Sequence, residues 1–362
     1  MRVLSVGPMS GLSNTCLQRH WAIERVAGEV DQVNTSRTGG FSLWYRIAYH
    51  LFWWLRLPVP LPESQGENAR IRQWVDSKTY DVVWIDKGIT ISPHTLRYIK
   101  RKQPQCRLVS YSPDNMALRH NQSQQYLQCI PLYDLMLTNK SYILDAMRAL
   151  GARDICFVDN CFEPTFHHPR ELTAEEQERL GSEVGFVGAW EQERCASLLF
   201  LAAHGLKVKV WGDGKWNDYR GTPNMEIGPG LYSDDYPKAL QAARISLCFL
   251  RKINFDQQTT RTMEIPACGG FMMAERTPEH ERLFVDGKEA VFFSSDEELL
   301  QKCRYYLAHE SERQAIARAG RARCLASDYT TEGMVRRALQ QICPARAKEI
   351  AAQAQTQTSS HG

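Results

Sequence analysis

Residues 261–284 read RTMEIPACGGFMMAERTPEHERLF, and this stretch decides the fold. A polar lead that ends in Thr259 and Thr260 runs into a short helix from Arg261, then a tight glycine turn and a buried apolar strand. The free backbone N–H groups and the dipole of a helix start both favour negative charge, so an anion is expected here. Glu264 follows one helical turn later and can accept two hydrogen bonds from a vicinal diol. Phosphate and diol together predict a site for a nucleoside diphosphate and its ribose.

The same order of apolar strand, glycine turn and amphipathic helix recurs along the rest of the chain. The predicted strands are residues 3–7, 82–85, 108–111, 135–138, 155–158, 184–188, 208–211, 245–250 and 271–274. Apolar strands that alternate with helices predict a parallel sheet covered on both faces. The polar stretch 163–182 interrupts this pattern, which then starts again. Two such starts in one chain predict two Rossmann-like α/β domains.

The composition is that of an ordinary globular protein, with 43% hydrophobic and 23% charged residues among 362. A formal net charge of +3 argues against a large nucleic-acid footprint. The eleven cysteines form no CxxC pair, which favours free thiols in a reducing compartment over disulfides or a zinc site. The chain start lacks the pattern of a signal peptide and no apolar run reaches about 18 residues, so we expect a cytoplasmic protein.

Five short segments in the second half of the chain occur in a characteristic order. They are the Arg-to-Gly-Gly run 261–270, Glu-Arg-Thr-Pro-Glu at 275–279, GKEAVFFSSDEEL at 287–299, Tyr-Tyr-Leu at 305–307 and Ala-Gly-Arg at 319–321. In this order they resemble the C-terminal half of the CgeB-like (spore maturation protein type) glycosyltransferases. The resemblance is strong over 183–339 and weaker at 81–88 and 111–115. It implies the GT-B fold, an α/β architecture of two facing Rossmann-like domains with parallel sheets.

This resemblance also implies a division of labour between the domains. We expect an N-terminal domain on the acceptor side over residues 1–165, a linker over 166–182 and a C-terminal domain on the donor side over 183–330. A helix over 331–345 is expected to brace the N-terminal domain, as in relatives of this fold. The tail 346–362, rich in Ala, Gln, Thr and Ser, is expected to be disordered.

The turns after the C-terminal strands are the expected donor site, because ligands of open α/β sheets bind at the carboxyl ends of the strands. Gly188 ends the first of these strands and looks like the family's turn near the phosphates, with Arg194 on the helix behind it. Gly212 and Asp213 resemble the family's loop near the nucleobase; a simple tight turn is the alternative. These residues complete the predicted donor set with Arg251, Lys252, Thr259, Thr260, Arg261 and Glu264.

Two alternatives remain open within that set. Arg251 and Lys252 emerge at the tip of an apolar strand, where they bind the diphosphate or form a solvated charge pair. Arg261 binds phosphate, forms an ion pair with Glu264 or makes a C-terminal contact to the linker. Glu264 binds the ribose or lies on a helix surface. The expected co-substrate is a UDP-, GDP- or TDP-sugar, and no further cofactor is expected. The sequence has no evident DxD pair for a metal, so Arg, Lys and the helix dipole are expected to balance the phosphate charge.

Three aspartates are the catalytic candidates. Asp114 and Asp86 each follow a buried strand of the first domain; Asp114 is the first choice as general base or donor-sugar contact. The alternatives are a helix N-cap for Asp114 and an ion pair with neighbouring Lys87 for Asp86. Asp256 stands eight positions before Glu264, where many retaining GT-B enzymes carry a glutamate, so a retaining reaction is favoured.

The first glycine loop and the histidines of the N-terminal half are further candidates. Gly7, Ser10 and Gly11 form a loop whose amides are able to approach the donor phosphate or the acceptor. The histidines His20, His94 and His120 are predicted on helices, where a lone histidine is more often structural than catalytic.

Residues 41–57, FSLWYRIAYHLFWWLRL, are dense in aromatics and broken by two arginines and a histidine. The stretch is too short and too charged to span a bilayer. We favour a core helix of the first domain with arginines that extend to solvent; the alternative is an interfacial helix in peripheral contact with a membrane.

We therefore predict a glycosyltransferase that moves a sugar from a nucleotide diphosphate to a hydroxyl of a glycan, protein or lipid-linked acceptor. Two other classes remain open. A nucleotide-sugar epimerase shares the double Rossmann layout, and a nucleotide-sugar-binding protein without turnover is compatible with Asp256 in place of glutamate.

Overall fold

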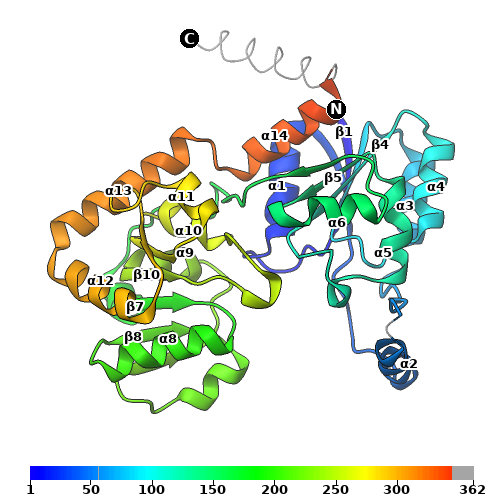
Figure 1. Ribbon diagram of the computed structural model, residues 1–362. Helices are drawn as coiled ribbons and strands as arrows, with labels where there is room; N and C mark the ends of the chain where they lie inside the picture. Colours follow the sequence, from blue (N-terminus) through cyan, green and yellow to red (C-terminus); the bar gives the residue numbers. More distant parts are fainter. Residues whose placement is uncertain (56, 345–362) are drawn as a thin grey trace, which may run out of the picture. The chain divides into compact units, whose positions relative to one another are not determined.

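The computed structural model describes residues 1–55 and 57–344. The predicted disordered tail 346–362 lies outside these residues. The described chain divides into two compact units (Figure 1). Unit 1 comprises residues 1–159 and the chain from Glu332 onward, and unit 2 comprises Asn160–Thr331.

Unit 1 is built on a six-stranded parallel sheet of order β2-β1-β3-β4-β5-β6. Its strands are β1 (Arg2–Gly7), β2 (Glu29–Asn34), β3 (Val82–Asp86), β4 (Arg107–Ser112), β5 (Leu135–Thr138) and β6 (Ile155–Phe157). Every residue of the central β3 is buried, as expected for a strand covered on both faces. The sheet is flanked by α1 (Thr15–Ala27), α3 (Glu67–Ser77), α4 (Pro93–Lys102), α5 (Gln124–Cys129) and α6 (Leu144–Ala149).

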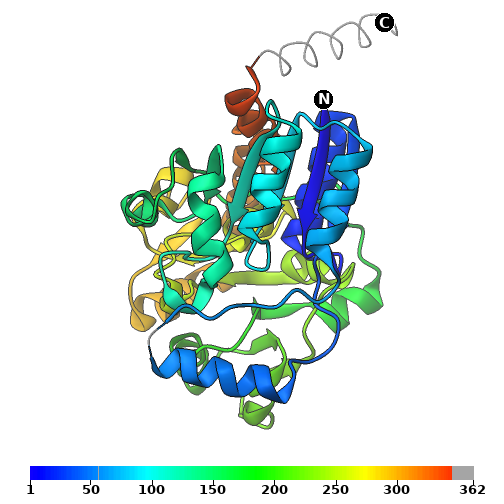
Figure 2. The ribbon, with the colours of Figure 1, turned by 90° about the vertical axis from the view of Figure 1, so that its right-hand side faces the viewer.

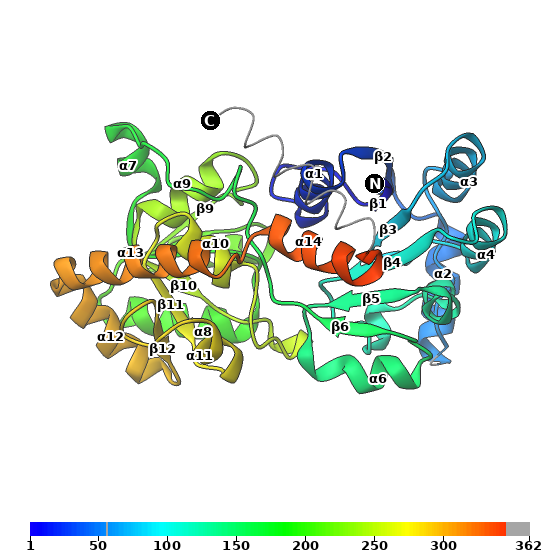
Figure 3. The same cartoon turned by 90° about the horizontal axis from the view of Figure 1, so that it is seen from above.

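The C-terminal helix α14 (Thr331–Ile342) belongs almost entirely to unit 1. Glu332 forms an ion pair with Arg25 of α1, and Gln341 donates a hydrogen bond to the Cys156 sulfur of β6. Figure 3 shows α14 beside α1 and the strands β5 and β6. Val335 and Leu339 lie on its buried face, so the helix contributes to the core of the unit that the chain had left at residue 159.

Unit 2 repeats this architecture with a six-stranded parallel sheet of order β12-β11-β10-β7-β8-β9. Its strands are β7 (Ser182–Val187), β8 (Val208–Trp211), β9 (Met225–Gly228), β10 (Ala243–Cys248), β11 (Met272–Glu275) and β12 (Val291–Phe293). Its helices are α7 (Ala174–Leu180), α8 (Gln192–Ala203), α9 (Asp235–Ala242), α10 (Arg261–Ala267), α11 (Pro278–Leu283), α12 (Asp296–Ala308) and α13 (Glu310–Ala326). Separate apolar clusters form its core. The two sheets confirm the predicted α/β class.

Unit 2 starts earlier than the predicted boundary at residue 165, and the predicted linker 166–182 is part of it. Phe162 and Phe166 are buried in a core cluster of this unit, and α7 starts with a capping box at Thr173. Because the segment is polar in composition, the burial of these two phenylalanines was not predicted. Phe162 also pairs with Thr330, so the first and last segments of unit 2 run side by side.

The helix α2 (Leu43–Trp54) corrects the preferred interpretation of residues 41–57 as a core helix. It has no buried residue. Figures 1 and 2 show it apart from the helices that flank the sheet of unit 1. Arg119 holds its C-terminal end, because its guanidinium donates hydrogen bonds to three main-chain oxygens, those of Phe52, Trp53 and Leu57. The apolar composition was correctly detected, but composition does not say what covers a helix.

Candidate functional site

In unit 2, two glycine turns meet at the carboxyl ends of β7 and β8. The N–H of Gly188 donates to the Trp211 oxygen at 3.0 Å, and the Trp216 indole donates to the Gly188 oxygen at 2.8 Å. A Cβ on Gly188 would lie 3.1 Å from a guanidinium nitrogen of Arg261, and one on Gly212 would lie 2.6 Å from the Gly188 oxygen. The absence of a side chain at Gly188 therefore lets the Arg261 guanidinium approach the end of β7, and its absence at Gly212 lets the two turns pack against each other.

Three predicted arginines form a positive cluster beside this turn. Arg194 is buried and donates from Nε to the Leu250 oxygen and from Nη1 to the Ala189 oxygen, both at 3.2 Å. Burial lowers the pKa of Arg194 to about 10; nearby Glu191 acts in the opposite direction, and the charges of Arg261 and Arg251 lower it further. A cation with a lowered pKa in positive surroundings gains from the arrival of an anion.

The same cluster holds two buried donors without a hydrogen-bond partner in the part of the chain that the structure describes. They are Nη2 of Arg194 and Nε of Arg261. Buried polar atoms are nearly always paired, and guanidinium groups pair well with phosphate oxygens. The arrangement is therefore complementary to a phosphate or diphosphate.

Glu264 is buried, which rules out the helix-surface alternative. Its Oε2 accepts a hydrogen bond from the Tyr236 hydroxyl at 2.5 Å, and its Oε1 lies 3.6 Å from Nε2 of His167. Burial, and next the charge of Glu264, raises the pKa of Tyr236 well above its usual value, so the phenol stays protonated and donates. Burial also lowers the pKa of His167. A carboxylate has about four acceptor positions, so Glu264 retains capacity for a ligand hydroxyl.

The segment before α10 carries three more predicted residues. Thr260 precedes the helix, and its main-chain oxygen accepts from the N–H groups of Met263 and Glu264 at 3.0 Å. Thr259 is buried, and its N–H donates to the Thr262 hydroxyl at 3.1 Å. Asp256 is also buried, and its N–H donates to the Arg251 oxygen at 3.2 Å. The segment is thus fixed by hydrogen bonds within itself and to the first turn of α10.

The remaining donor candidates have charged or hydroxyl partners within unit 2. Arg251 bonds to Glu191 at 2.9 Å, and Lys252 forms an ion pair with Glu275. The exposed Asp213 accepts from the Gly230 N–H at 2.9 Å and from the Tyr232 hydroxyl at 2.6 Å. Through these hydrogen bonds, Asp213 holds the loop that follows β9.

In unit 1, Asp86 and Asp114 have partners other than those considered from the sequence. Asp86 is buried and accepts from Nε of Arg19 at 2.8 Å and from the Trp84 indole at 3.0 Å. Burial raises the pKa of Asp86, while Arg19 acts in the opposite direction. Lys87 pairs instead with Asp114 at 2.9 Å. The N-cap alternative for Asp114 is wrong, since the next turn is closed by the Asn115 side chain, which accepts from Ala117.

The first glycine loop of unit 1 has a packing role. A Cβ on Gly7 would lie 2.4 Å from the Cys16 sulfur and 2.7 Å from Cβ of Asp86, so only glycine fits there. Ser10 is exposed, and Gly11 has a φ of +88° with open space around it. The loop leads to Asn14, which caps α1.

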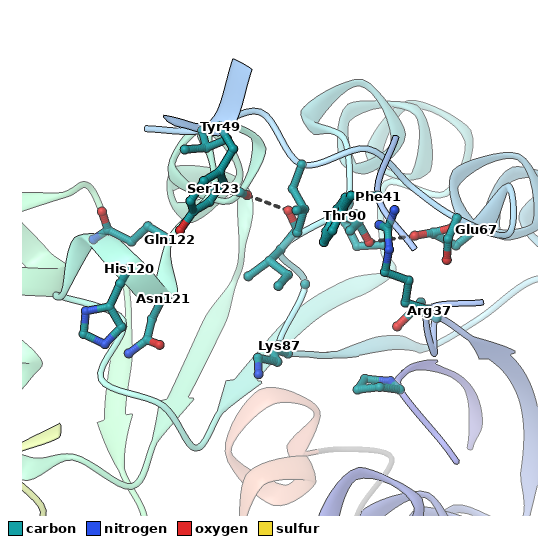
Figure 4. A pocket seen from close by; sticks show the side chains of 18 of the residues that line it. Arg37, Phe41, Tyr49, Glu67, Lys87, Thr90, His120, Asn121, Gln122 and Ser123 are labelled. Carbon is teal, nitrogen blue, oxygen red and sulfur yellow. Dashed lines mark hydrogen bonds between the residues drawn. The ribbon is translucent and has the colours of Figure 1, made fainter. Parts of the chain in front are cut away.

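A cavity of about 400 Å³ in unit 1 lies against α2 (Figure 4). One wall is aromatic and consists of Phe41, Tyr45, Tyr49 and Trp53. The polar lining includes Arg37, Glu67, Lys87, Thr90, Arg119, His120, Asn121, Gln122 and Ser123. Aromatic faces beside hydroxyl, amide and charged groups suit a sugar or another amphiphilic molecule. The sequence pointed to this cavity only through the aromatic density of residues 41–57.

The comparisons with known proteins agree with this architecture. Residues 193–340 match the model of a family described as glycosyl transferase-like. The Anabaena Alr3699/HepE structure in complex with UDP-glucose is 14% identical with a TM-score of 0.58, covering 98% of this chain and all of that one. The fold is GT-B. A Rickettsia africae glycosyltransferase is 12% identical with a TM-score of 0.62, and the match covers 97% of this chain and 98% of that one.

A protein assigned as a UDP-N-acetylglucosamine 2-epimerase from Listeria monocytogenes has the same GT-B fold at 11% identity and a TM-score of 0.51. That match covers 88% of this chain and 91% of the Listeria chain. No curated protein matches the chain. The GT-B fold is therefore common to a transferase and an epimerase, and the site has to decide between them.

Two site residues were missed from the sequence. His167 lies in the segment predicted as a linker, and Tyr236 lies on α9, which the strand pattern did not reveal. Both contact Glu264. No local motif marks either residue, because their importance comes from tertiary contact alone.

Proposed function

We propose that the chain is a glycosyltransferase of the CgeB-like type that moves a sugar, most simply a hexose, from a nucleoside diphosphate to an acceptor hydroxyl. The observation that carries this proposal is the cluster of Arg194, Arg251 and Arg261 beside the Gly188 turn, with two buried donors that no described residue pairs. A diphosphate supplies both the negative charge and the acceptor oxygens that the cluster lacks.

Each donor-site residue has a role in this proposal. Arg194 and Arg261 bind the diphosphate, and their charge stabilises the leaving group as the bond to the sugar breaks. Glu264, held by Tyr236 and His167, accepts hydrogen bonds from the ribose hydroxyls. Gly188 lets Arg261 approach the end of β7, and Gly212 lets the two turns pack closely beside it. UDP is the first nucleotide to test, because the HepE structures hold UDP and UDP-glucose.

The aspartates complete the proposed chemistry. A retaining reaction is favoured, in which the leaving phosphate takes the acceptor proton and Asp256 contacts the donor sugar. Asp114 is the group of unit 1 proposed to orient the acceptor, and its ion pair with Lys87 fixes the position of its carboxylate. Asp86 accepts hydrogen bonds from Arg19 and Trp84 and so supports the turn that carries Lys87.

Unit 1 is the proposed acceptor side, and its 400 Å³ cavity is the proposed acceptor pocket. The acceptor is a glycan, a protein or a lipid-linked hydroxyl, in the synthesis of a glycoconjugate or surface polysaccharide. We propose that the reaction takes place in the cytoplasm, with residues 41–57 in peripheral contact with the inner face of the membrane.

Nucleotide binding tests the proposal directly. We expect UDP, GDP or TDP to raise the melting temperature, since a ligand that binds only the folded state stabilises it. Arg261→Ala should weaken binding of that nucleotide about 10- to 100-fold in isothermal titration calorimetry, as expected for loss of a charge-assisted hydrogen bond. The matched control is Arg179→Ala, an exposed arginine of unit 2 paired with Asp235, which should leave Kd unchanged. If no nucleotide shifts the melting temperature, the proposal is wrong.

The epimerase alternative is supported by the Listeria structure and makes a different prediction. A transferase releases free nucleoside diphosphate from the sugar donor faster when acceptor is present. An epimerase instead interconverts two nucleotide sugars without acceptor. Donor hydrolysis that Glu264→Ala abolishes would exclude a binding protein without turnover.

A further inference from the structure

The helix α2 has apolar residues around most of its circumference but no buried residue. A helix that is apolar all round is normally buried in a core or in lipid. Trp44 and Trp54 are 81% and 78% exposed. The described residues of the chain therefore leave a large apolar surface on this helix uncovered.

The two faces of α2 differ in what they meet. The inner face carries Tyr45, Tyr49 and Trp53, which line the cavity of unit 1 (Figure 4 labels Tyr49). The outer face is exposed and consists of Leu43, Trp44, Ile47, Leu51, Trp54 and Leu55. These positions follow helical spacing and form one continuous apolar stripe.

The helix is held in this orientation by unit 1. The guanidinium of Arg119 bonds to the main-chain oxygens at the end of α2 and lies 4.9 Å from the centre of the Trp53 ring. Arg37 lies 3.5 Å over the ring of Phe41, which precedes the helix. These contacts on the inner side fix the orientation of α2, so that the apolar stripe faces outward.

The charge around the stripe identifies what covers it. No Asp or Glu occurs between Asp31 and Glu63, whereas Arg37, Arg46 and Arg56 do. Arg46 and His50 are exposed beside the stripe. Tryptophan and leucine flanked by arginine, without acidic residues, match the interface of a bilayer with anionic headgroups. A second copy in an isologous contact would instead bring basic residues against basic residues.

A bilayer contact of this kind lies in the plane of the membrane and does not cross it. A helix of 12 residues is about 18 Å long, whereas a membrane span needs about 20 residues. Among the described helices, none has the length and apolar character needed to cross a membrane.

We propose that the outer face of α2 binds a bilayer surface rich in anionic lipid, with Trp44 and Trp54 at headgroup depth and Arg46 at the lipid phosphates. This inference specifies the membrane contact of the proposed function, but it needs neither donor binding nor turnover. It assigns to α2 the role of placing the cavity of unit 1 next to the lipid surface.

Vesicle co-sedimentation tests this inference. The full chain should sediment with phosphatidylcholine vesicles that contain phosphatidylglycerol, and less with phosphatidylcholine alone or in high salt. The double variant Trp44→Ser and Trp54→Ser should lower the partition coefficient about tenfold or more, because binding scales with buried apolar area. The matched control is Val285→Ser with Leu325→Ser, two half-exposed apolar residues of unit 2, which should bind as the unchanged chain does.

Three outcomes would overturn the inference. The chain stays in the supernatant with anionic vesicles, or the tryptophan variant sediments like the unchanged chain. The third is a dimer in size-exclusion chromatography that becomes a monomer in the tryptophan variant, since the stripe then binds a second copy. UDP titration of the same samples separates this result from a failure of the proposed function, because α2 lies in unit 1 and the arginine cluster in unit 2.

Discussion

His280 is a buried residue of unit 2 whose two ring nitrogens are both engaged. Nδ1 lies 2.6 Å from the Glu275 oxygen, and Nε2 lies 2.9 Å from the Thr262 hydroxyl. A carbonyl only accepts, so Nδ1 carries the proton and Nε2 accepts from Thr262. A second proton on the ring would break the bond from Thr262 and place a charge in the core, and burial lowers the pKa of His280 to about 4.

This lowered pKa predicts a loss of stability in mild acid. The unfolded chain protonates His280 near pH 6.5, whereas the folded chain does so only near pH 4. Between these values the unfolded state binds more protons, so the free energy of unfolding falls as the pH falls, by roughly 3 kcal/mol at most. Denaturant titrations at pH 7.5 and pH 5 measure it. His280→Asn should flatten the dependence, and His94→Asn, at an exposed site of α4, should leave it unchanged.

Asp86 shows why partners of single residues were predicted poorly. The neighbouring Lys87 was the obvious candidate from the sequence. Lys87 adopts a positive φ of 65°, and its side chain reaches Asp114 instead. The actual partner, Arg19, comes from α1, distant in the sequence but close in the fold. The residues that stand at strand ends are predictable, because the alternation of strands and helices shows where each strand stops. The partners of those residues are not predictable in this way, because they depend on packing between elements.

At the scale of elements, Gly212 is the most closely packed glycine of the two turns that follow β7 and β8. A Cβ there would lie 2.4 Å from Cδ1 of Trp216 and 2.6 Å from the main-chain oxygen of Gly188. Gly212→Ala should therefore displace both turns, lower the free energy of unfolding by roughly 1–3 kcal/mol and weaken nucleotide binding. Gly40→Ala, where a Cβ meets nothing within 4 Å, should change neither quantity. Equal effects of the two substitutions in thermal unfolding and titration calorimetry would contradict this account.

Most of the strands that the sequence predicted share one property. They are largely apolar and lie in the interior of a sheet, and all nine predicted strands occur in the structure, including the edge strand β6. The missed strands β2, β9 and β12 are edge strands or very short. The sequence EVDQVN of β2 carries four polar residues and only one buried position, so its pattern is that of a loop. An edge strand is fixed by its neighbour rather than by its own composition.

At the scale of the whole molecule, the chain leaves unit 1 at residue 159 and returns at 332. Unit 2 is thus one continuous segment with its own sheet and core. We expect residues 160–331 to unfold cooperatively when expressed alone, as followed by circular dichroism, and to bind the same nucleotide as the full chain. Absence of a cooperative transition would show that this segment depends on unit 1.

The opposite result is expected for residues 1–159 alone. This fragment lacks α14, whose Val335 and Leu339 are buried in the full chain. Removal of α14 exposes the apolar surface that these side chains cover. Truncation of even one such buried side chain lowers the free energy of unfolding by roughly 2–5 kcal/mol. The fragment should melt at a lower temperature than residues 160–331 and bind a hydrophobic dye such as ANS. Addition of a peptide with the α14 sequence should reverse both effects.

Unit 2 is a single inserted segment of the chain, and the pairing of Phe162 with Thr330 holds its two ends together. Its two ends emerge as neighbours, so a few glycines suffice to join residue 160 to residue 331 in a circular permutant. The same geometry permits exchange of the entire segment for that of a relative without a change in the chain path of unit 1. If unit 2 binds the donor as proposed, exchange of this segment should change the donor preference while unit 1 stays as it is.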